Sequence, residues 1–348
     1  MFKRWYMVSL YSVTHFLVDF TCAFIMFRNI SRSPDWHICI LIYNFCAFAM
    51  QMPLGIVADK LNRNYLFAGI GCIMVAGAYG LTSLPLIAAV VAGMGNGAFH
   101  IGGGIDVLNI SEEKSGALGV YVSPGAFGVY FGTMSGKGTG LPAIPVLIAL
   151  LVMTVLIFAA RRIWGGAYVD NAPLSPPVSS SALIAAGCLF LVVCLRSYVG
   201  LALNFPWKSA GYWGLALVCA TVFGKVAGGI LSDRLGQMKT AVISLGAAAV
   251  LFLVPGIPVA GVVAVLLFNM TMPVTLWVLA KTLPGAKGFS FGLLTFALFL
   301  GFLPVYRGAG TPPAWMFAAL AASSLVILIA GLVYFKKVSA YMKTLMRS

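Results

Sequence analysis

Charged residues are scarce in this sequence. Asp, Glu, Lys and Arg make up 9% of the 348 residues, and only eight of them are acidic, whereas 61% of the residues are hydrophobic. Soluble domains carry about a quarter of their residues as charged side chains, so the composition excludes an ordinary soluble protein. Apolar runs of membrane-spanning length recur from end to end, with short polar connections between them. We therefore predict an all-α polytopic membrane protein.

Motifs for metals, cofactors and covalent catalysis are also missing. The seven cysteines form no CxxC pair and fall inside apolar runs, which argues against disulfides and structural metal sites. No glycine-rich stretch contains Gly-Lys-Ser/Thr, so no phosphate-binding loop is present. The three histidines accompany no nucleophile motif. We expect no cofactor, no metal site and no enzymatic activity.

The hydrophobic runs predict twelve transmembrane helices in two six-helix pseudo-repeats. A proline-containing polar segment, Arg161–Ser180, lies at mid-chain and is typical of a linker. We predict a first bundle at 1–162, a cytoplasmic linker at 163–180, a second bundle at 181–337 and a cytoplasmic tail at 338–348. The predicted spans are 5–27, 36–58, 65–83, 86–108, 115–134, 143–161, 181–203, 209–231, 240–257, 259–280, 288–305 and 314–335.

The basic residues predict the orientation in the membrane. The net charge of +14 comes from Lys and Arg that flank apolar spans, so we expect the lipid bilayer and not nucleic acid as the partner. With twelve spans, fifteen Lys and Arg lie on the side of the termini and five on the other. Cytoplasmic loops carry the excess of Lys and Arg, so both termini are expected in the cytoplasm.

A charged loop occurs twice, half a chain length apart. Asp59 and Asp233 are 174 positions apart in a chain of 348, each just after a predicted span. The first copy contains Gly55, Asp59, Lys60 and Arg63; the second contains Gly229, Asp233, Arg234 and Gly236. A glycine lets two helices approach closely, and an aspartate accepts from a helix N-terminus or a neighbouring cation. We interpret both copies as a cytoplasmic gate; the alternative is a basic turn that only sets topology.

These repeated loops resemble the signature of the major facilitator superfamily, whose transporters contain internal repeats. The second copy matches the Gly-x-x-x-Asp-Arg/Lys-x-Gly pattern more fully, because the first has Asn62 where a glycine is usual. A narrower resemblance links Gly95–His100 and Leu195-Arg196-Ser197 to the fosmidomycin-resistance-like exporters. His100 is followed by Ile101, where that branch has a proline.

Ionisable side chains inside apolar spans are costly, so each is a candidate functional residue. His15 and Asp19, spaced i, i+4, share one helical face, and we assign them to proton coupling because histidine changes charge near neutral pH. The alternative is a fixed ion pair. Arg196 keeps its proton, so it needs Asp19, another acid or an anionic substrate group as partner.

Three polar residues complete the predicted substrate site: His100, Asn44 and Asn269. The alternative for the two asparagines is hydrogen bonding from helix to helix. His100 precedes Gly102-Gly103-Gly104, which we expect to loosen this span at membrane depth. Asp106 is either a second acidic site or a cap of the same span.

Together these features predict a secondary active transporter that moves a small organic solute by alternating access, as proton-coupled export. One alternative is proton-coupled uptake of a small organic anion or nutrient; another is a membrane interaction or lipid-handling protein without transport. We expect a monomer in the bacterial cytoplasmic membrane, with protons and a small-molecule substrate as partners.

Overall fold

We describe the protein from a computed structural model. It describes residues 2–111, 114–138, 142–163, 165, 169–173, 179–310 and 312–345. Parts of the predicted linker, at 164, 166–168 and 174–178, lie outside the described residues, as do residues 346–348 of the predicted tail.

The described residues form helices and connecting turns, without any β-strand. The prediction of an all-helical chain is therefore confirmed for this part of the protein. The helices are α1 (Phe2–Arg28), α2 (Trp36–Asn44), α3 (Gln51–Leu61), α4 (Asn64–Gly80), α5 (Pro85–Ser111), α6 (Gly116–Val122), α7 (Pro124–Gly136), α8 (Ala143–Ile163), α9 (Ser180–Ala202), α10 (Trp213–Leu235), α11 (Gln237–Leu251), α12 (Pro258–Asn269), α13 (Thr271–Thr282), α14 (Lys287–Tyr306) and α15 (Ala314–Leu345), with a 3-10 turn, η1 (Ile30–Arg32), and a π-helical turn, η2 (Phe45–Ala49).

Each predicted span coincides with one helix or with a broken pair of helices. Among the described residues, nine helical segments are long and apolar enough to cross a membrane. Two shorter apolar helices, Asn64–Gly80 and Gln237–Leu251, fall between them. The remaining predicted span corresponds to the pair α6 and α7.

Three spans are interrupted for identifiable reasons. Between α2 and α3 the chain forms the π-helical turn η2, and such bulges bend a helix by inserting an extra residue. Ser123 separates α6 from Pro124, the first residue of α7, and proline is tolerated there because its missing N–H has no helical partner. Met270 separates α12 from α13, three residues before Pro273.

The chain divides into two compact units. The first comprises Met1–Glu112, Val120–Asn171 and Lys287–Phe296; the second comprises Glu113–Gly119, Ala172–Ala286 and Ala297–Ser348. The first turns of α14 thus belong to unit 1, and the beginning of α6 belongs to unit 2.

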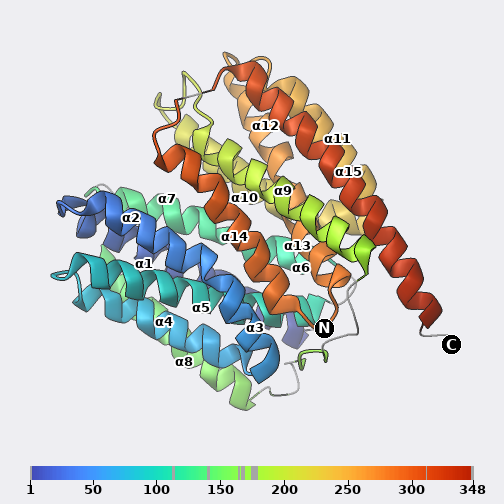
Figure 1. The fold of residues 1–348 in the computed structure, drawn as a ribbon. Coiled ribbons are helices and arrows are strands. Elements are labelled where there is room, and N and C mark those ends of the chain that lie inside the picture. The colour runs from blue at the N-terminus through green and yellow to red at the C-terminus, as the bar shows by residue number, and fades with distance from the viewer. Residues whose placement is uncertain are drawn as a thin grey trace. The chain divides into compact units, whose positions relative to one another are not determined.

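Unit 1 is built on two close helix pairs, α1 with α7 and α4 with α5, and α8 packs on α4 (Figure 1). The α1–α7 contact depends on small residues, since a Cβ at Gly128 or Gly132 of α7 would meet the backbone oxygen of Phe16 or Phe20 of α1. Close backbone approach at glycine is a common mode of helix packing in membranes. It brings the polar face of α1 against α7.

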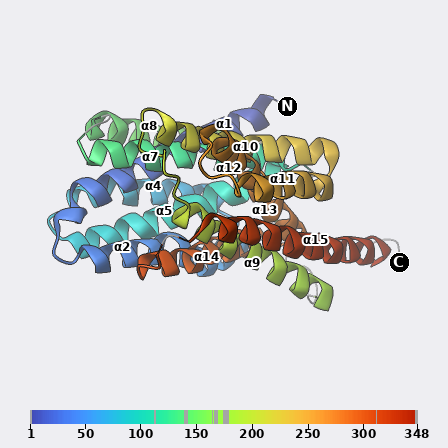
Figure 2. The same ribbon diagram turned by 90° about the horizontal axis from the view of Figure 1, so that it is seen from above.

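In unit 2, α15 packs along α9 and α11, and α10 packs along α12. Both views show α9 and α15 side by side (Figures 1 and 2). Arg196 lies on α9, and α13 packs against the same helix.

The expected loosening at Gly102-Gly103-Gly104 is wrong, because α5 is a continuous helix from Pro85 to Ser111. The three glycines instead make room for neighbouring backbone and side chains. A Cβ at Gly102 would meet the backbone of α4, one at Gly103 would meet the hydroxyl of Tyr121 and the ring of Tyr11, and one at Gly104 would meet the ring of Phe291.

Candidate functional site

A cluster of three ionisable side chains lies inside unit 1. His15 and Asp19 come from α1 and His100 from α5, and the side chains are 7%, 14% and 12% exposed. The Nε2 atom of His15 lies 3.2 Å from a carboxylate oxygen of Asp19. The Nε2 atom of His100 lies 2.8 Å from Nε2 of His15 and 3.9 Å from the other oxygen of Asp19. The predicted proton-coupling pair and the predicted substrate residue His100 therefore form one site.

Backbone carbonyls fix the tautomer of both imidazoles. Nδ1 of His15 lies 2.8 Å from the carbonyl oxygen of Tyr121, and Nδ1 of His100 lies 2.8 Å from that of Asn96. A carbonyl oxygen only accepts hydrogen bonds. We therefore assign the hydrogen to Nδ1 in each ring, an assignment made from the partners of the ring nitrogens.

This assignment leaves the two Nε2 atoms facing each other across 2.8 Å. In two neutral rings with Nδ1–H, both Nε2 atoms carry lone pairs and neither donates. One additional proton placed between them makes one ring a donor and the other an acceptor. The carboxylate of Asp19 lies beside this proton, and Asn96 Nδ2 donates to that carboxylate at 2.8 Å. The arrangement thus fits one positive charge shared by two histidines and balanced by one aspartate.

The same three residues offer ligand atoms that a metal ion could use, since these atoms all lie within 4.8 Å of one another. Two imidazole nitrogens bound at about 2.1 Å to one tetrahedral ion lie about 3.4 Å apart. The observed 2.8 Å is shorter and matches a hydrogen bond. A metal ion would need the two rings to separate, whereas a proton fits them as they are.

Gly125 of α7 closes the cluster on a third side. A Cβ at this position would meet Nε2 of His15 and an oxygen of Asp19. The Tyr121 ring lies beside His15, with ring centroids 5.2 Å apart. The cluster is thus packed by α1, α5, α6 and α7 together.

Asp106 forms a second buried acidic site on α5. Its carboxylate accepts from the hydroxyl of Tyr11 at 2.6 Å and from Asn64 Nδ2 at 2.9 Å. Tyr11 is one helical turn from His15 on α1, and both face α5. The alternative of a simple cap of the span is not favoured, because Asp106 bonds to side chains of α1 and α4.

In unit 2, Arg196 is 9% exposed. Its Nη1 atom donates to the hydroxyl of Thr275 on α13 at 3.3 Å, and that hydroxyl donates to the carbonyl of Met272 at 2.9 Å. A neutral hydroxyl does not balance the charge of a guanidinium. Arg196 therefore retains the capacity to bind an anion.

Asn44 and Asn269, the two other predicted substrate residues, are half-buried. Asn44 Nδ2 donates to the carbonyl of Ile40, and Asn269 Nδ2 to that of Val265, each at 2.8 Å and each one turn back in its own chain segment. A carboxamide has two donor hydrogens and an acceptor oxygen. Each side chain is held in place by one bond, with further bonding capacity for other partners.

The first predicted gate loop caps a helix of the same unit. The Asp59 carboxylate accepts from the backbone N–H groups of Gly288 and Phe289, at 2.7 and 2.9 Å, in the first turn of α14. A Cβ at Gly55 would meet the Gly288 backbone. Lys60 and Arg63 are exposed. Asp59 thus binds the positive end of a helix, over a separation of 229 residues.

The second loop repeats this arrangement in unit 2. The Asp233 carboxylate accepts from the N–H groups of Ser115 and Gly116, at 2.7 and 2.9 Å, where α6 begins. A Cβ at Gly229 would meet the Ser115 carbonyl oxygen, and Arg234 is exposed. The two copies are therefore alike in sequence and in geometry.

The two loops each end their helix at a residue with positive φ. Asn62 follows α3 with φ of 50°, in the left-handed region, and Gly236 follows α10 with φ of 85°. With ψ of 39°, Asn62 has the left-handed helical conformation that asparagine as well as glycine adopts at helix ends. Gly236 has ψ of 154°, a conformation that is essentially restricted to glycine.

Comparisons with known proteins agree with this architecture. No family model matches the sequence. An uncharacterized MFS-type transporter of Bacillus subtilis, YfiU, is 39% identical over 62 residues, which are 18% of this chain and 12% of YfiU. The match therefore spans a small part of that relative's length.

Solved structures resemble nearly the whole chain. The Escherichia coli fucose:proton symporter FucP, a major facilitator superfamily transporter, has a TM-score of 0.64 at 12% identity, over 95% of this chain and 98% of FucP. The chain has the major facilitator fold. A bacterial homologue of the iron transporter ferroportin, in an outward-facing state, has a TM-score of 0.59 at 16% identity, over 96% of this chain and 99% of that one. With its apolar helices, this fold makes the chain an integral membrane protein; the resemblance to fosmidomycin-resistance-like exporters stays a prediction.

Sequence reasoning missed several residues of the site. It did not identify Asn96, Tyr121 or Gly125, which hold the cluster together. The i, i+4 spacing of Asn96 and His100 on one face of α5 was an available signal. The contact of His100 with His15 had no local signal, because it depends on how α1 and α5 pack.

Proposed function

We propose that the chain is a secondary active transporter that moves a small organic solute by alternating access, coupled to protons in the direction of export. The observation that carries this proposal is the cluster of His15, Asp19 and His100, a buried site whose hydrogen-bond geometry fits one exchangeable proton. Ionisable groups within membrane-spanning helices are expensive to bury and are usually retained for function. The major facilitator fold supports transport as the general activity.

Proton exchange at this site would act on helix packing. With a proton between the two Nε2 atoms, the site attracts the carboxylate of Asp19. Without it, two lone pairs face each other at 2.8 Å beside a negative charge, which is repulsive. Loss of the proton therefore favours separation of α1 from α5, and this movement is the proposed link between protonation and conformation.

We assign substrate binding to Arg196. Further contacts with the substrate are assigned to His100, Asn44 and Asn269. Arg196 supports an anionic or polar group on the solute, since its observed acceptor, Thr275, is neutral. An arginine keeps its charge and presents several donors in a fixed plane. His100 would sense both the proton and the substrate.

The two capped helix ends are proposed as the cytoplasmic gate. Gly55, Asp59, Lys60 and Arg63 form one copy, and Gly229, Asp233, Arg234 and Gly236 form the other. Each aspartate accepts two backbone N–H groups of a distant helix. Breaking these bonds and forming them again is the proposed switching step.

For the membrane topology we propose twelve crossings, in two bundles at 1–162 and 181–337, with both termini in the cytoplasm. The nine long helical segments, the two shorter apolar helices and the pair α6–α7 together supply twelve. The Lys and Arg bias among the connecting loops supports the orientation, and the cytoplasmic membrane of a bacterium is the proposed location.

Uptake is the second candidate for the direction of transport. FucP is a fucose:proton symporter, and the same residues would serve inward flux. The resemblance to exporters favours efflux.

Proteoliposomes that contain a lumenal pH indicator test the proposal. Fosmidomycin would be the anionic probe, because the sequence resembles the fosmidomycin-resistance-like exporters. L-fucose would be the probe for uptake. Solute-dependent proton movement is expected for the wild type and for Asp35→Asn, a control at an exposed acid. It should be absent in Asp19→Asn. Equal proton movement in Asp19→Asn and Asp35→Asn would refute the assignment, and drug sensitivity of cells with and without the chain would separate export from uptake.

A further inference from the structure

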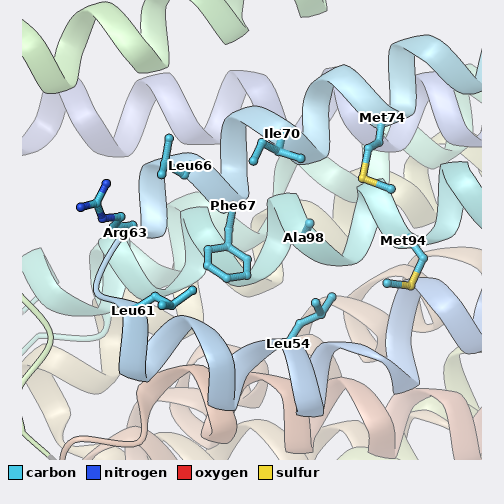
Figure 3. A pocket seen from close by; sticks show the side chains of 9 residues that line it. All are labelled: Leu54, Leu61, Arg63, Leu66, Phe67, Ile70, Met74, Met94 and Ala98. Carbon is cyan, nitrogen blue, oxygen red and sulfur yellow. The ribbon is translucent and has the colours of Figure 1, made fainter.

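An apolar pocket of about 320 Å³ lies in unit 1 between α3, α4 and α5. Eight of its nine lining residues, among those that the structure describes, are apolar, and the ninth is Arg63. Figure 3 shows Arg63 at one end, and Met74 and Met94 at the other, with Phe67 between. The proposed proton and substrate residues do not line it.

The pocket opens to the outside of the helices. Ile70, in its lining, is 50% exposed, and Leu61 is 56% exposed. The outside of apolar helices in a membrane protein is lipid. The natural occupant of such an opening is therefore a molecule that is already dissolved in the bilayer.

The dimensions match one leaflet. Arg63 and Met74 are eleven residues apart, which along α4 corresponds to about 16 Å at 1.5 Å per residue. The hydrocarbon core of a bilayer is about 30 Å thick, so the pocket follows roughly half of it. A single acyl chain that starts at Arg63 would end near Met74 and Met94.

The charge at the open end defines the head group. Arg63 is exposed where α4 begins, and Lys60 is exposed in the same loop. Arginine forms paired hydrogen bonds with phosphate, and basic residues at the membrane surface attract anionic lipids. Small-molecule sites usually have several polar groups that fix the orientation of a ligand; this pocket has one, at its end.

We propose that this pocket is a binding site for an anionic phospholipid, with one acyl chain between α3, α4 and α5 and the phosphate on Arg63. If the 55–63 loop is cytoplasmic, as proposed above, this site lies in the cytoplasmic leaflet. The binding itself needs no substrate, proton gradient or transport.

The test uses the full chain in phosphatidylcholine nanodiscs that contain a small fraction of a photoreactive phospholipid. The reactive group is placed near the end of one acyl chain, on phosphatidylglycerol or on phosphatidylcholine. After illumination, mass spectrometry locates the labelled residues. Labelling of Met74 or Met94 is expected, roughly fivefold stronger with phosphatidylglycerol, as a basic residue near an anionic head group predicts.

Matched variants separate the head group from the chain. Arg63→Gln should remove the preference for phosphatidylglycerol, whereas Arg162→Gln, at an exposed arginine of α8, should keep it. Ile70→Trp should fill the opening and lower labelling of Met74 and Met94. Ile73→Trp, at an equally exposed position of α4 outside the lining, should not.

Equal labelling by both lipids, unchanged in Arg63→Gln, would overturn the preference for an anionic head group at Arg63. Labelling of Met74 and Met94 that persists in Ile70→Trp would overturn the placement of the chain in the pocket. Both results are independent of whether the protein moves protons, so they are distinct from a failure of the proposed transport function.

Discussion

Replacement of Gly125 by alanine places one methyl group in the proton cluster. A Cβ at this position would overlap Nε2 of His15 and an oxygen of Asp19. Inserting a methyl group into a packed interior costs about 1–3 kcal/mol, whereas alanine gains less than about 1 kcal/mol over glycine in a helix. We expect Gly125→Ala to be less stable by about 1–2 kcal/mol and to lose proton coupling, because His15 or Asp19 has to move.

The matched control is Gly77→Ala, at an exposed helical glycine of α4 where a Cβ would contact nothing within 4 Å. It should be as stable as the wild type or slightly more stable, with full coupling. Thermal unfolding in detergent and proton movement in proteoliposomes would be measured on both variants. If Gly125→Ala matches Gly77→Ala in both assays, the close packing around His15 and Asp19 is not as described.

Two further predictions concern the caps and the arginine. Asp59→Asn and Asp233→Asn should each cost about 1 kcal/mol, since each weakens an anionic cap of a helix; unfolding temperatures equal to that of Asp35→Asn would contradict this. Thr275→Val should cost about 1–3 kcal/mol by removing the acceptor of the buried Arg196, measured by unfolding against Thr282→Val, a buried threonine of the same helix whose hydroxyl donates to the carbonyl of Val278.

The sequence was informative where local spacing determines geometry. The i, i+4 spacing of His15 and Asp19 predicted that they share a face, and their atoms are 3.2 Å apart. The aspartate of each charged loop was expected to accept from a helix N-terminus or a cation, and both accept from N-termini. Periodicity and motif chemistry were sufficient for these features.

Features that depend on packing between distant segments were not accessible in this way. The helix that Asp59 caps begins 228 positions further along the chain, and no local pattern identifies it. The contact of His100 with His15 was not expected, because it depends on how α1 and α5 pack; the assignment of His100 to the substrate stays a prediction. The triple glycine was expected to loosen α5; its missing side chains instead admit α4, Tyr11 and Phe291.

The proton shared by His15 and His100 is tested most directly by nitrogen NMR of isotope-labelled histidine in the protein reconstituted in lipid. The chain has three histidines, so His37→Gln leaves only His15 and His100. We expect both rings to carry a hydrogen on Nδ1 and one strongly deshielded proton to couple to Nε2 of both. Two neutral rings with separate signals, one of them carrying its hydrogen on Nε2 and not on Nδ1, would contradict a shared proton.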